Sequence, residues 1–246
     1  MFSLKKGFLI ARVENTKVYI TEDENQDQDN QDNGILSKII ELPKTKKFTF
    51  LPPNDSFRLG VAGPSGAGKS TFVASVIEEY KKIYKKNKVF MVSPTKDDDA
   101  YSKLPFIEYI RIDETLIDDP IDFREFTSCL IIFDDSEVLS PNKKINEAIE
   151  MFRNQLLENG RKLKISTIAV NHIAMNGAQT KKMLNECQLM CVFPKSNFAA
   201  VKKLAEKYWG FDKAEIEYLR KINSRWVLVK NSYPQAILSE RQLKLV

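Results

Sequence analysis

The feature that most constrains the fold is a glycine-rich loop between an apolar run and an amphipathic stretch. Residues 63–71 read Gly-Pro-Ser-Gly-Ala-Gly-Lys-Ser-Thr, a full match to the pattern G-x-x-x-x-G-K-[ST] in the required context of strand, loop and helix. Such a loop turns several backbone N–H groups toward one point, so the loop and the helix N-terminus can bind phosphate. The alternative interpretation is a glycine-rich turn without a ligand.

Each part of this loop has an expected role. We expect Lys69 to contact the β- and γ-phosphates of a nucleotide, Ser70 to offer its hydroxyl to Mg²⁺, and Thr71 to bind the α-phosphate. The predicted cofactors are therefore ATP and Mg²⁺. The residues expected to bind the nucleotide are Gly63, Pro64, Ser65, Gly66, Ala67, Gly68, Lys69, Ser70 and Thr71.

Short apolar runs alternate with longer amphipathic stretches beyond residue 56, a pattern typical of βαβ units around a mostly parallel sheet. The predicted fold class is α/β, with helices flanking the sheet and small β additions at both termini. Strands are expected at 57–62, 88–93, 129–133, 164–170 and 189–193, with a short edge strand at 107–112. Helices are expected at 69–85, 143–159, 179–185, 197–208 and 212–221.

The two ends of the chain differ from this central pattern. A β-hairpin is expected at 7–13 and 16–20, and a second one at 226–230 and 235–238. Pro52-Pro53 prevents a regular element from continuing. We therefore divide the chain into an N-terminal extension, residues 1–55, and an ATPase domain, residues 56–246.

Two adjacent carboxylates, Asp134 and Asp135, follow an apolar run that is expected to form the third strand. The carboxyl ends of the strands in an open α/β sheet are where ligands bind. We expect Asp134 to hold Mg²⁺ through water and Asp135 to act as the base that orients or deprotonates the attacking water. A strand-end turn is the alternative, and Glu137 is a less favoured substitute for Asp135.

Three more residues are candidates for the catalytic machinery. His172 comes at the carboxyl end of the fourth strand, where it could sense the γ-phosphate or a water molecule, with Asn171 as the substitute and a structural histidine as the alternative. Arg161, next to Gly160, is expected in a surface turn, from which it could act in trans on a neighbouring subunit. Arg153 is the other candidate, and a solvated surface charge is the alternative interpretation.

The net charge of +5 hides a strong local asymmetry. Residues 22–33 carry six acidic residues and no apolar one, which predicts a solvated loop rather than a regulatory mimic of a polyanion. Residues 136–246 contain 19 basic and 10 acidic residues and carry +9. Most of these basic residues are lysines, whose point-like charge suits contact with the phosphates of the DNA backbone. The alternative interpretation is an ordinary helix face exposed to solvent. The aromatic residues of this region are expected in the core.

Composition excludes several other classes of protein. With 43% apolar and 29% charged residues, the chain is neither disordered nor collagen-like. No apolar run approaches the ~20 residues that a membrane span needs, and no secretory signal is recognisable. Three cysteines with a single histidine offer no convincing zinc set. We expect a soluble protein of a reducing intracellular compartment.

Together, the motifs resemble the genome-packaging ATPases of nucleocytoplasmic large DNA viruses and poxviruses, within the FtsK/HerA group of P-loop NTPases. The resemblance spans roughly residues 57–196 and rests on the order of six segments. These are the phosphate loop, Val92-Ser-Pro-Thr95, Ile132-Phe-Asp-Asp135, Gly-Arg-Lys-Leu-Lys-Ile-Ser at 160–166, Leu-Asn-Glu-Cys at 184–187, and Val-Phe-Pro at 192–194.

The chain departs from the family's pattern at three places. Lys162 stands where the family usually has histidine, His172 where it usually has glutamine, and no arginine lies near Leu184. Arg161 remains as the arginine that the resemblance implies.

The resemblance implies a RecA-like sheet with the strand order 5-1-4-3-2 and a homo-oligomeric ring of subunits. It also implies ATP hydrolysis coupled to translocation of double-stranded DNA into a viral capsid, with capsid or vertex proteins as partners, in the virion or the host-cell cytoplasm. The catalytic residues would be Lys69, Asp135, His172 and Arg161. Two other functions stay open: a nucleotide or nucleoside kinase, and a nucleotide-gated assembly protein without turnover.

Overall fold

The computed structural model describes residues 56–246 except 95–97, 137–139, 173–176, 233–234 and 241. Of the first 55 residues it describes the backbone of five short strands, and of residues 177–180 the backbone alone. The predicted acidic loop at 22–33 and Glu137 lie outside the described residues.

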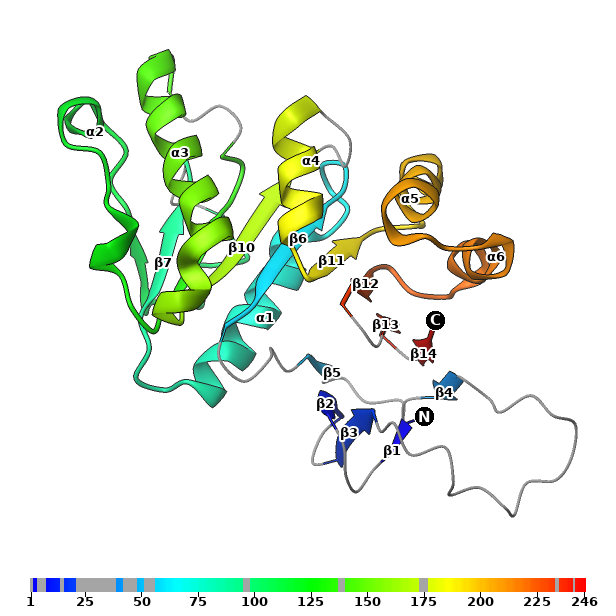
Figure 1. Ribbon diagram of the computed structural model, residues 1–246. Helices are drawn as coiled ribbons and strands as arrows, with labels where there is room; N and C mark the ends of the chain where they lie inside the picture. The colour runs from blue at the N-terminus through cyan, green and yellow to red at the C-terminus, as the bar shows by residue number, and fades with distance from the viewer. Residues whose placement is uncertain are drawn as a thin grey trace, which may run out of the picture.

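Six parallel strands form the centre of a ten-stranded sheet (Figure 1). Their spatial order is β11-β6-β10-β9-β7-β8. In the numbering of the five predicted strands this is 5-1-4-3-2, so the predicted order is confirmed, and β8 adds the expected edge strand. The bounds are β6 (Arg58–Ala62), β7 (Val89–Val92), β8 (Ile107–Tyr109), β9 (Leu130–Phe133), β10 (Ser166–Asn171) and β11 (Leu189–Val192).

Four antiparallel strands extend this sheet beyond β11. They are β12 (Val227–Lys230), β13 (Ala236–Ser239), β14 (Gln242–Leu245) and β4 (Ile39–Glu41). β12 and β13 form the predicted terminal hairpin, and β14 continues it. β4 comes from the predicted N-terminal extension yet pairs with β14, so part of that extension completes the main sheet.

The remaining N-terminal strands form a separate four-stranded sheet. β2 and β3 are its predicted hairpin and pair antiparallel. Its members are β1 (Phe2–Ser3), β2 (Phe8–Val13), β3 (Thr16–Ile20) and β5 (Phe48–Phe50).

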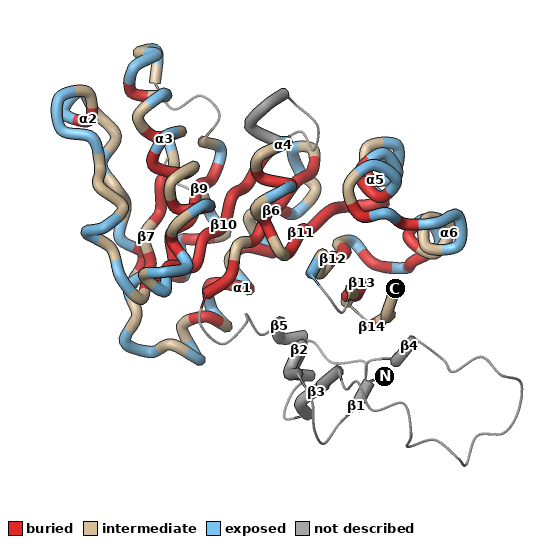
Figure 2. Tube along the Cα trace, in the orientation of Figure 1, coloured by how far each residue is buried: buried red, intermediate tan, exposed pale blue. Residues whose placement is uncertain are grey.

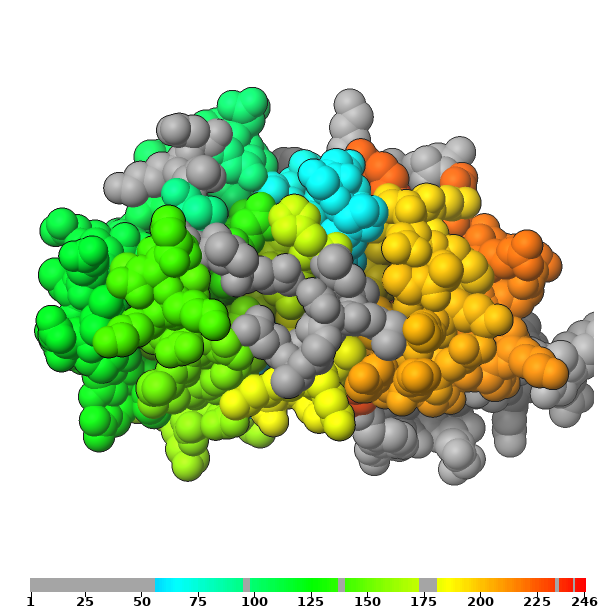
Figure 3. Space-filling model, turned by 90° about the horizontal axis from the view of Figure 1, so that it is seen from above, coloured from blue at the N-terminus to red at the C-terminus, as the bar shows by residue number. Residues whose placement is uncertain are grey.

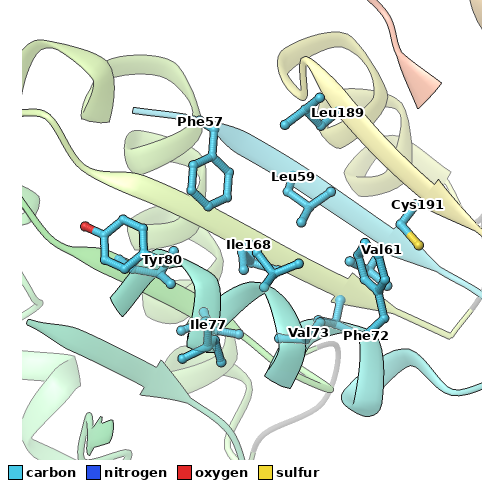
Figure 4. Close-up of a cluster of buried hydrophobic side chains, with 14 of the residues drawn as sticks. Phe57, Leu59, Val61, Phe72, Val73, Ile77, Tyr80, Ile168, Leu189 and Cys191 are labelled. Atoms are coloured by element: carbon cyan, nitrogen blue, oxygen red, sulfur yellow. The ribbon is translucent and has the colours of Figure 1, made fainter. Parts of the chain in front are cut away.

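The helices cover both faces of the main sheet. α1 packs on one face, where Val73 and Ile77 meet Leu59 and Val61 of β6 (Figure 4). α3 to α6 pack on the other face, where alternate strand residues point. The strands are therefore buried on both sides, as parallel strands usually are (Figure 2). The bounds are α1 (Lys69–Ile83), α2 (Thr115–Asp118), α3 (Lys143–Asn159), α4 (Gly177–Glu186), α5 (Phe198–Leu204) and α6 (Lys213–Lys221).

Two elements differ locally from the prediction. The helix predicted at 197–208 consists of α5 and a π-helical turn at Ala205–Trp209, which ends at Gly210 with φ of 68°. The fourth strand begins at Ser166 rather than at residue 164, because Gly160–Leu163 form a 3₁₀ turn and Lys164 is left-handed, with φ of 57°. Among the described residues, no helix combines the length and the apolar character needed to cross a membrane.

Candidate nucleotide-binding site

The glycine-rich loop connects the end of β6 to the start of α1. Gly66 and Gly68 have φ of 74° and 98°, a left-handed conformation that glycine adopts without steric cost. Gly68 is also the N-cap of α1, and no side chain among the described residues caps that end. The free N–H groups of the first helical turn are therefore available to an anion.

Gly63 is the point where the loop lies closest to the sheet. A Cβ atom at this position would lie 2.7 Å from Cδ2 of Phe193, the buried residue that follows β11. The N–H of Gly63 donates to the carbonyl oxygen of Asn171, at 3.3 Å. Glycine is therefore required here by packing, and the loop is attached to the end of β10.

Lys69 is buried in the loop, with 7% of its surface exposed. Its Nζ donates to the carbonyl oxygen of Pro64 and lies 3.2 Å from Nδ1 of His172. A buried ammonium group needs such partners because desolvation disfavours an isolated charge. The ammonium charge is thus held at the loop, where a bound phosphate would meet it.

Asp134 is buried directly after β9 and belongs to a polar cluster with Tyr101 and Ser70. Its Oδ2 accepts a 2.7 Å hydrogen bond from the hydroxyl of Tyr101, and Ser70 is hydrogen-bonded to the same phenol. Burial raises the pKa of Asp134, and the nearby carboxylates of Asp135 and Asp98 raise it further. The hydrogen bond from Tyr101 and the charge of Lys69 oppose that rise.

Asp135 faces the cleft rather than the core. Its backbone is left-handed, with φ of 49°, which is uncommon for a residue with a side chain. Its Oδ1 lies 2.7 Å from Nε2 of His172, and about half of each side chain is exposed. The loop lysine, the histidine and this carboxylate therefore form one continuous chain of contacts.

These residues line a cleft of about 610 Å³ at the carboxyl edge of the sheet. Figure 3 looks onto this side of the molecule, where the cyan segment with the glycine-rich loop lies between the green and yellow parts of the chain. The lining residues are Ser65, Gly66, Gly68, Lys69, Ser70, Thr71, Asp98, Asp99, Ala100, Asp135 and His172. The predicted loop residues, Asp135 and His172 thus lie together.

The oxygen atoms near Ser70 fit Mg²⁺ held jointly with phosphates. A hydroxyl and a buried carboxylate are hard oxygen ligands of the kind that this ion prefers. Among the described residues, no group of three His, Cys, Asp or Glu side chains could hold a metal by itself. Ser70 and Asp134 would therefore hold Mg²⁺ together with water and the nucleotide, and the ion would neutralise phosphate charge.

The two candidate arginines lie in different surroundings. Arg161 is exposed in the 3₁₀ turn before β10, at the opposite end of that strand from His172. Arg153 is 5% exposed on α3, and its Nη1 lies 3.5 Å from the hydroxyl of Ser136. Of the two, Arg161 is accessible to a neighbouring molecule.

Asn171 is buried beside the loop, and its Oδ1 has no partner among the described residues.

The basic C-terminal region carries many ion pairs. Lys202 pairs with Glu206 on α5, and Glu217 pairs with both Arg220 and Lys221 on α6. On α5, the π-helical turn and α6, three exposed lysines have no ion pair with any described residue, namely Lys203, Lys207 and Lys213. The free positive charge is therefore smaller than the sequence count suggests. Of the aromatic residues, Trp209 and Phe211 are buried in the core, as expected.

Sequence reasoning missed Tyr101, Asp98 and Phe193. Tyr101 and Asp98 follow β7, whose carboxyl end lies at the same sheet edge as the glycine-rich loop, so the strand-end rule offered a signal for them. Phe193 ends the predicted fifth strand. Its contact with Gly63 could be predicted only from the knowledge that β11 lies next to β6 in the sheet.

Comparison with known proteins places the chain in a viral family. No known family model matches it. It is 34% identical over 227 residues to the uncharacterized protein V3 of Sputnik virophage, which covers 89% of this chain and 87% of V3. The chain belongs to the family of virophage protein V3.

Solved structures show the fold of this V3-family chain. The pCW3 conjugation coupling protein TcpA, solved with ATPγS, superposes with a TM-score of 0.53 at 12% identity, over 92% of this chain and 72% of TcpA. The predicted α/β fold, a mostly parallel sheet flanked by helices that resembles the P-loop NTPases, is thereby confirmed. The genome-packaging NTPase B204 of Sulfolobus turreted icosahedral virus 2 gives a TM-score of 0.48 at 14% identity, over 75% of this chain and 96% of B204.

Proposed function

We propose that this protein is an ATP-hydrolysing motor that translocates double-stranded DNA into a viral capsid. The observation that carries the proposal is the cleft in which Lys69, Asp135 and His172 meet beside the buried Asp134. Phosphoryl transfer needs a cation on the phosphates, a metal ligand and a group that orients water. Groups that could fill each of these three roles lie at this one edge of the sheet.

The residues would divide the chemistry as follows. The N–H groups of the loop and Lys69 bind the phosphates, with Ser70 and Asp134 on the side where Mg²⁺ would be held. Asp135, exposed to the cleft, accepts a proton from the attacking water. His172 contacts both Lys69 and Asp135, so it is placed to respond to the γ-phosphate.

Arg161 would complete the site from a neighbouring subunit. An arginine in trans stabilises the charge that grows during phosphoryl transfer. The distance along β10 between Arg161 and His172 argues against a role of this arginine in its own subunit. The proposal therefore includes a homo-oligomeric ring, in the virion or at the assembly site in the host cytoplasm, with a capsid or vertex protein as the docking partner.

DNA contact is assigned to the exposed lysines of α5 and the π-helical turn. Lys203 and Lys207 offer point charges without an ion pair among the described residues, which suits contact with phosphates of any sequence. The variant Lys203→Glu/Lys207→Glu should lose DNA stimulation while its basal ATP hydrolysis stays unchanged. The matched control is Lys85→Glu/Lys86→Glu, which reverses two exposed charges in the turn that follows α1. An equal loss in both variants would count against this surface.

Phosphate release from ATP, with and without long double-stranded DNA, tests the proposed activity. We expect DNA to stimulate release, and Asp135→Asn to lower kcat by about 10²–10⁴-fold, as expected when a general base is lost. Asp119→Asn, which removes an exposed carboxylate away from the cleft, should keep full activity. Phosphate transfer to a nucleoside would instead indicate a kinase. Nucleotide binding without turnover would indicate a nucleotide-gated assembly protein.

A further inference from the structure

The only histidine of the chain connects two charged residues of the cleft. Nδ1 of His172 lies 3.2 Å from Nζ of Lys69, and its Nε2 lies 2.7 Å from Oδ1 of Asp135. The lysine comes from the start of α1, the histidine from the end of β10 and the aspartate from the end of β9. The imidazole ring therefore lies directly between the loop lysine and the proposed base.

Lys69 determines which ring nitrogen carries the proton. An ammonium group only donates hydrogen bonds, so Nδ1 of His172 has to accept one. A neutral ring then carries its proton on Nε2, and this N–H donates to the carboxylate of Asp135. A doubly protonated ring would place a second donor against the ammonium group. The contacts on both sides thus select one neutral tautomer.

The bond from His172 also fixes the direction of the Asp135 carboxylate. The backbone of Asp135 is held in the left-handed region, a strained conformation that persists only where the surroundings stabilise it. The side chain is 47% exposed, so packing alone does not orient it. Among the described residues, the hydrogen-bond donor to this carboxylate is His172.

We propose that His172 is a tautomeric switch that keeps the carboxylate of Asp135 engaged in a hydrogen bond with the ring until a nucleoside triphosphate draws Lys69 from the ring. This inference rests on the proposed function, in which Lys69 binds phosphates and Asp135 activates water. When Lys69 turns to the phosphates, Nδ1 loses its donor and faces γ-phosphate oxygens, which only accept hydrogen bonds. The ring then takes up a proton from water on Nδ1 and gives the proton of Nε2 to water, with no net change in protons, and the carboxylate of Asp135 turns away from the unprotonated Nε2. Asp135 loses its donor and becomes free to accept a proton from water.

A γ-phosphate is the feature that should operate this switch. ADP also draws Lys69 away, but it places no acceptor beside Nδ1, so the proton stays on Nε2. The switch would thus keep the base engaged in the empty and ADP-bound states. It would release the base only when there is a bond to hydrolyse.

Nitrogen-15 NMR of the labelled protein reads this tautomer directly, because one histidine gives a single pair of ring nitrogens. We expect a protonated Nε2 and an unprotonated Nδ1 in the empty protein and with ADP, and the reverse with a non-hydrolysable ATP analogue. In the empty protein, Lys69→Ala should shift the Nδ1 signal and Asp135→Asn the Nε2 signal. Lys195→Ala, which removes an exposed lysine after β11, should shift neither.

Three results would overturn the inference. One is an empty protein with a proton on Nδ1 or on both nitrogens. Another is an analogue that binds, as measured by calorimetry, and leaves the proton on Nε2. The third is an analogue that does not bind at all, which would contradict the proposed function and the switch with it. The spectra of the empty protein separately test whether the Lys69–His172–Asp135 contacts select the tautomer.

Discussion

Adding one methyl group at Gly63 should destabilise the protein through a single contact. The new Cβ would lie 2.7 Å from Cδ2 of Phe193, about 1 Å closer than carbon atoms pack at their optimal separation. Phe193 is 2% exposed and cannot move into solvent. Overpacking of this kind costs about 1–3 kcal/mol. Gly63→Ala should therefore lower the free energy of unfolding by that amount, which corresponds to roughly 2–12 °C in the melting temperature.

A double-mutant cycle isolates this contact. Phe193→Ala should cost about 3–5 kcal/mol, because it removes a buried ring. In that background the methyl group of Gly63→Ala meets a cavity, so its own cost should fall to about zero and the coupling energy should be about 1–3 kcal/mol. Urea unfolding followed by circular dichroism gives the four free energies.

Gly160→Ala serves as the control, because its Cβ would make an ordinary contact at 3.5 Å from Cβ of Ile165. Its φ is −56°, a conformation that alanine adopts readily, so stability should stay the same or rise by up to about 1 kcal/mol. A penalty for Gly63→Ala that is unchanged by Phe193→Ala would refute the packing argument.

Three further predictions concern the metal, the trans arginine and α6. Ser70→Ala should bind nucleotide yet need more Mg²⁺ for half-maximal phosphate release, because one oxygen ligand is lost; an unchanged Mg²⁺ titration contradicts this. Arg161→Ala subunits should regain activity when mixed with Asp135→Asn subunits, since each supplies what the other lacks, and no rescue at any mixing ratio excludes the trans contact. Asp212 caps α6 through the N–H groups of Ala214 and Glu215, so Asp212→Ala should lower the melting temperature and Asp212→Asn, an equally good cap, should keep it.

The sheet and the phosphate loop could be predicted because both follow from local patterns. The loop glycines between an apolar strand and a helix define the turn, and the carboxyl ends of parallel strands share one edge. That rule predicts that Asp135 and His172 lie near Lys69, and the cleft contains all three. The strand order came from the resemblance, because periodicity does not state which strands are neighbours.

For Tyr101 the same rule indicates only the sheet edge after β7 and not the residue itself. It follows β7 in a long connection whose path depends on tertiary packing, and an isolated tyrosine is usually a core residue. Its hydroxyl reaches Asp134 only because that connection returns to the sheet edge. The ion pairs of α5 and α6 were predictable in principle, because Lys202 and Glu206 have the i,i+4 spacing of helix neighbours.

The most direct test of the central claim measures movement rather than hydrolysis. A third strand bound as a triplex near the end of a linear DNA duplex is displaced by any protein that moves along that duplex. The wild-type protein should displace this strand with ATP and Mg²⁺, but not with ADP, and Lys69→Ala should not displace it under any condition. ATP hydrolysis that DNA stimulates without displacement of the third strand would contradict the motor function.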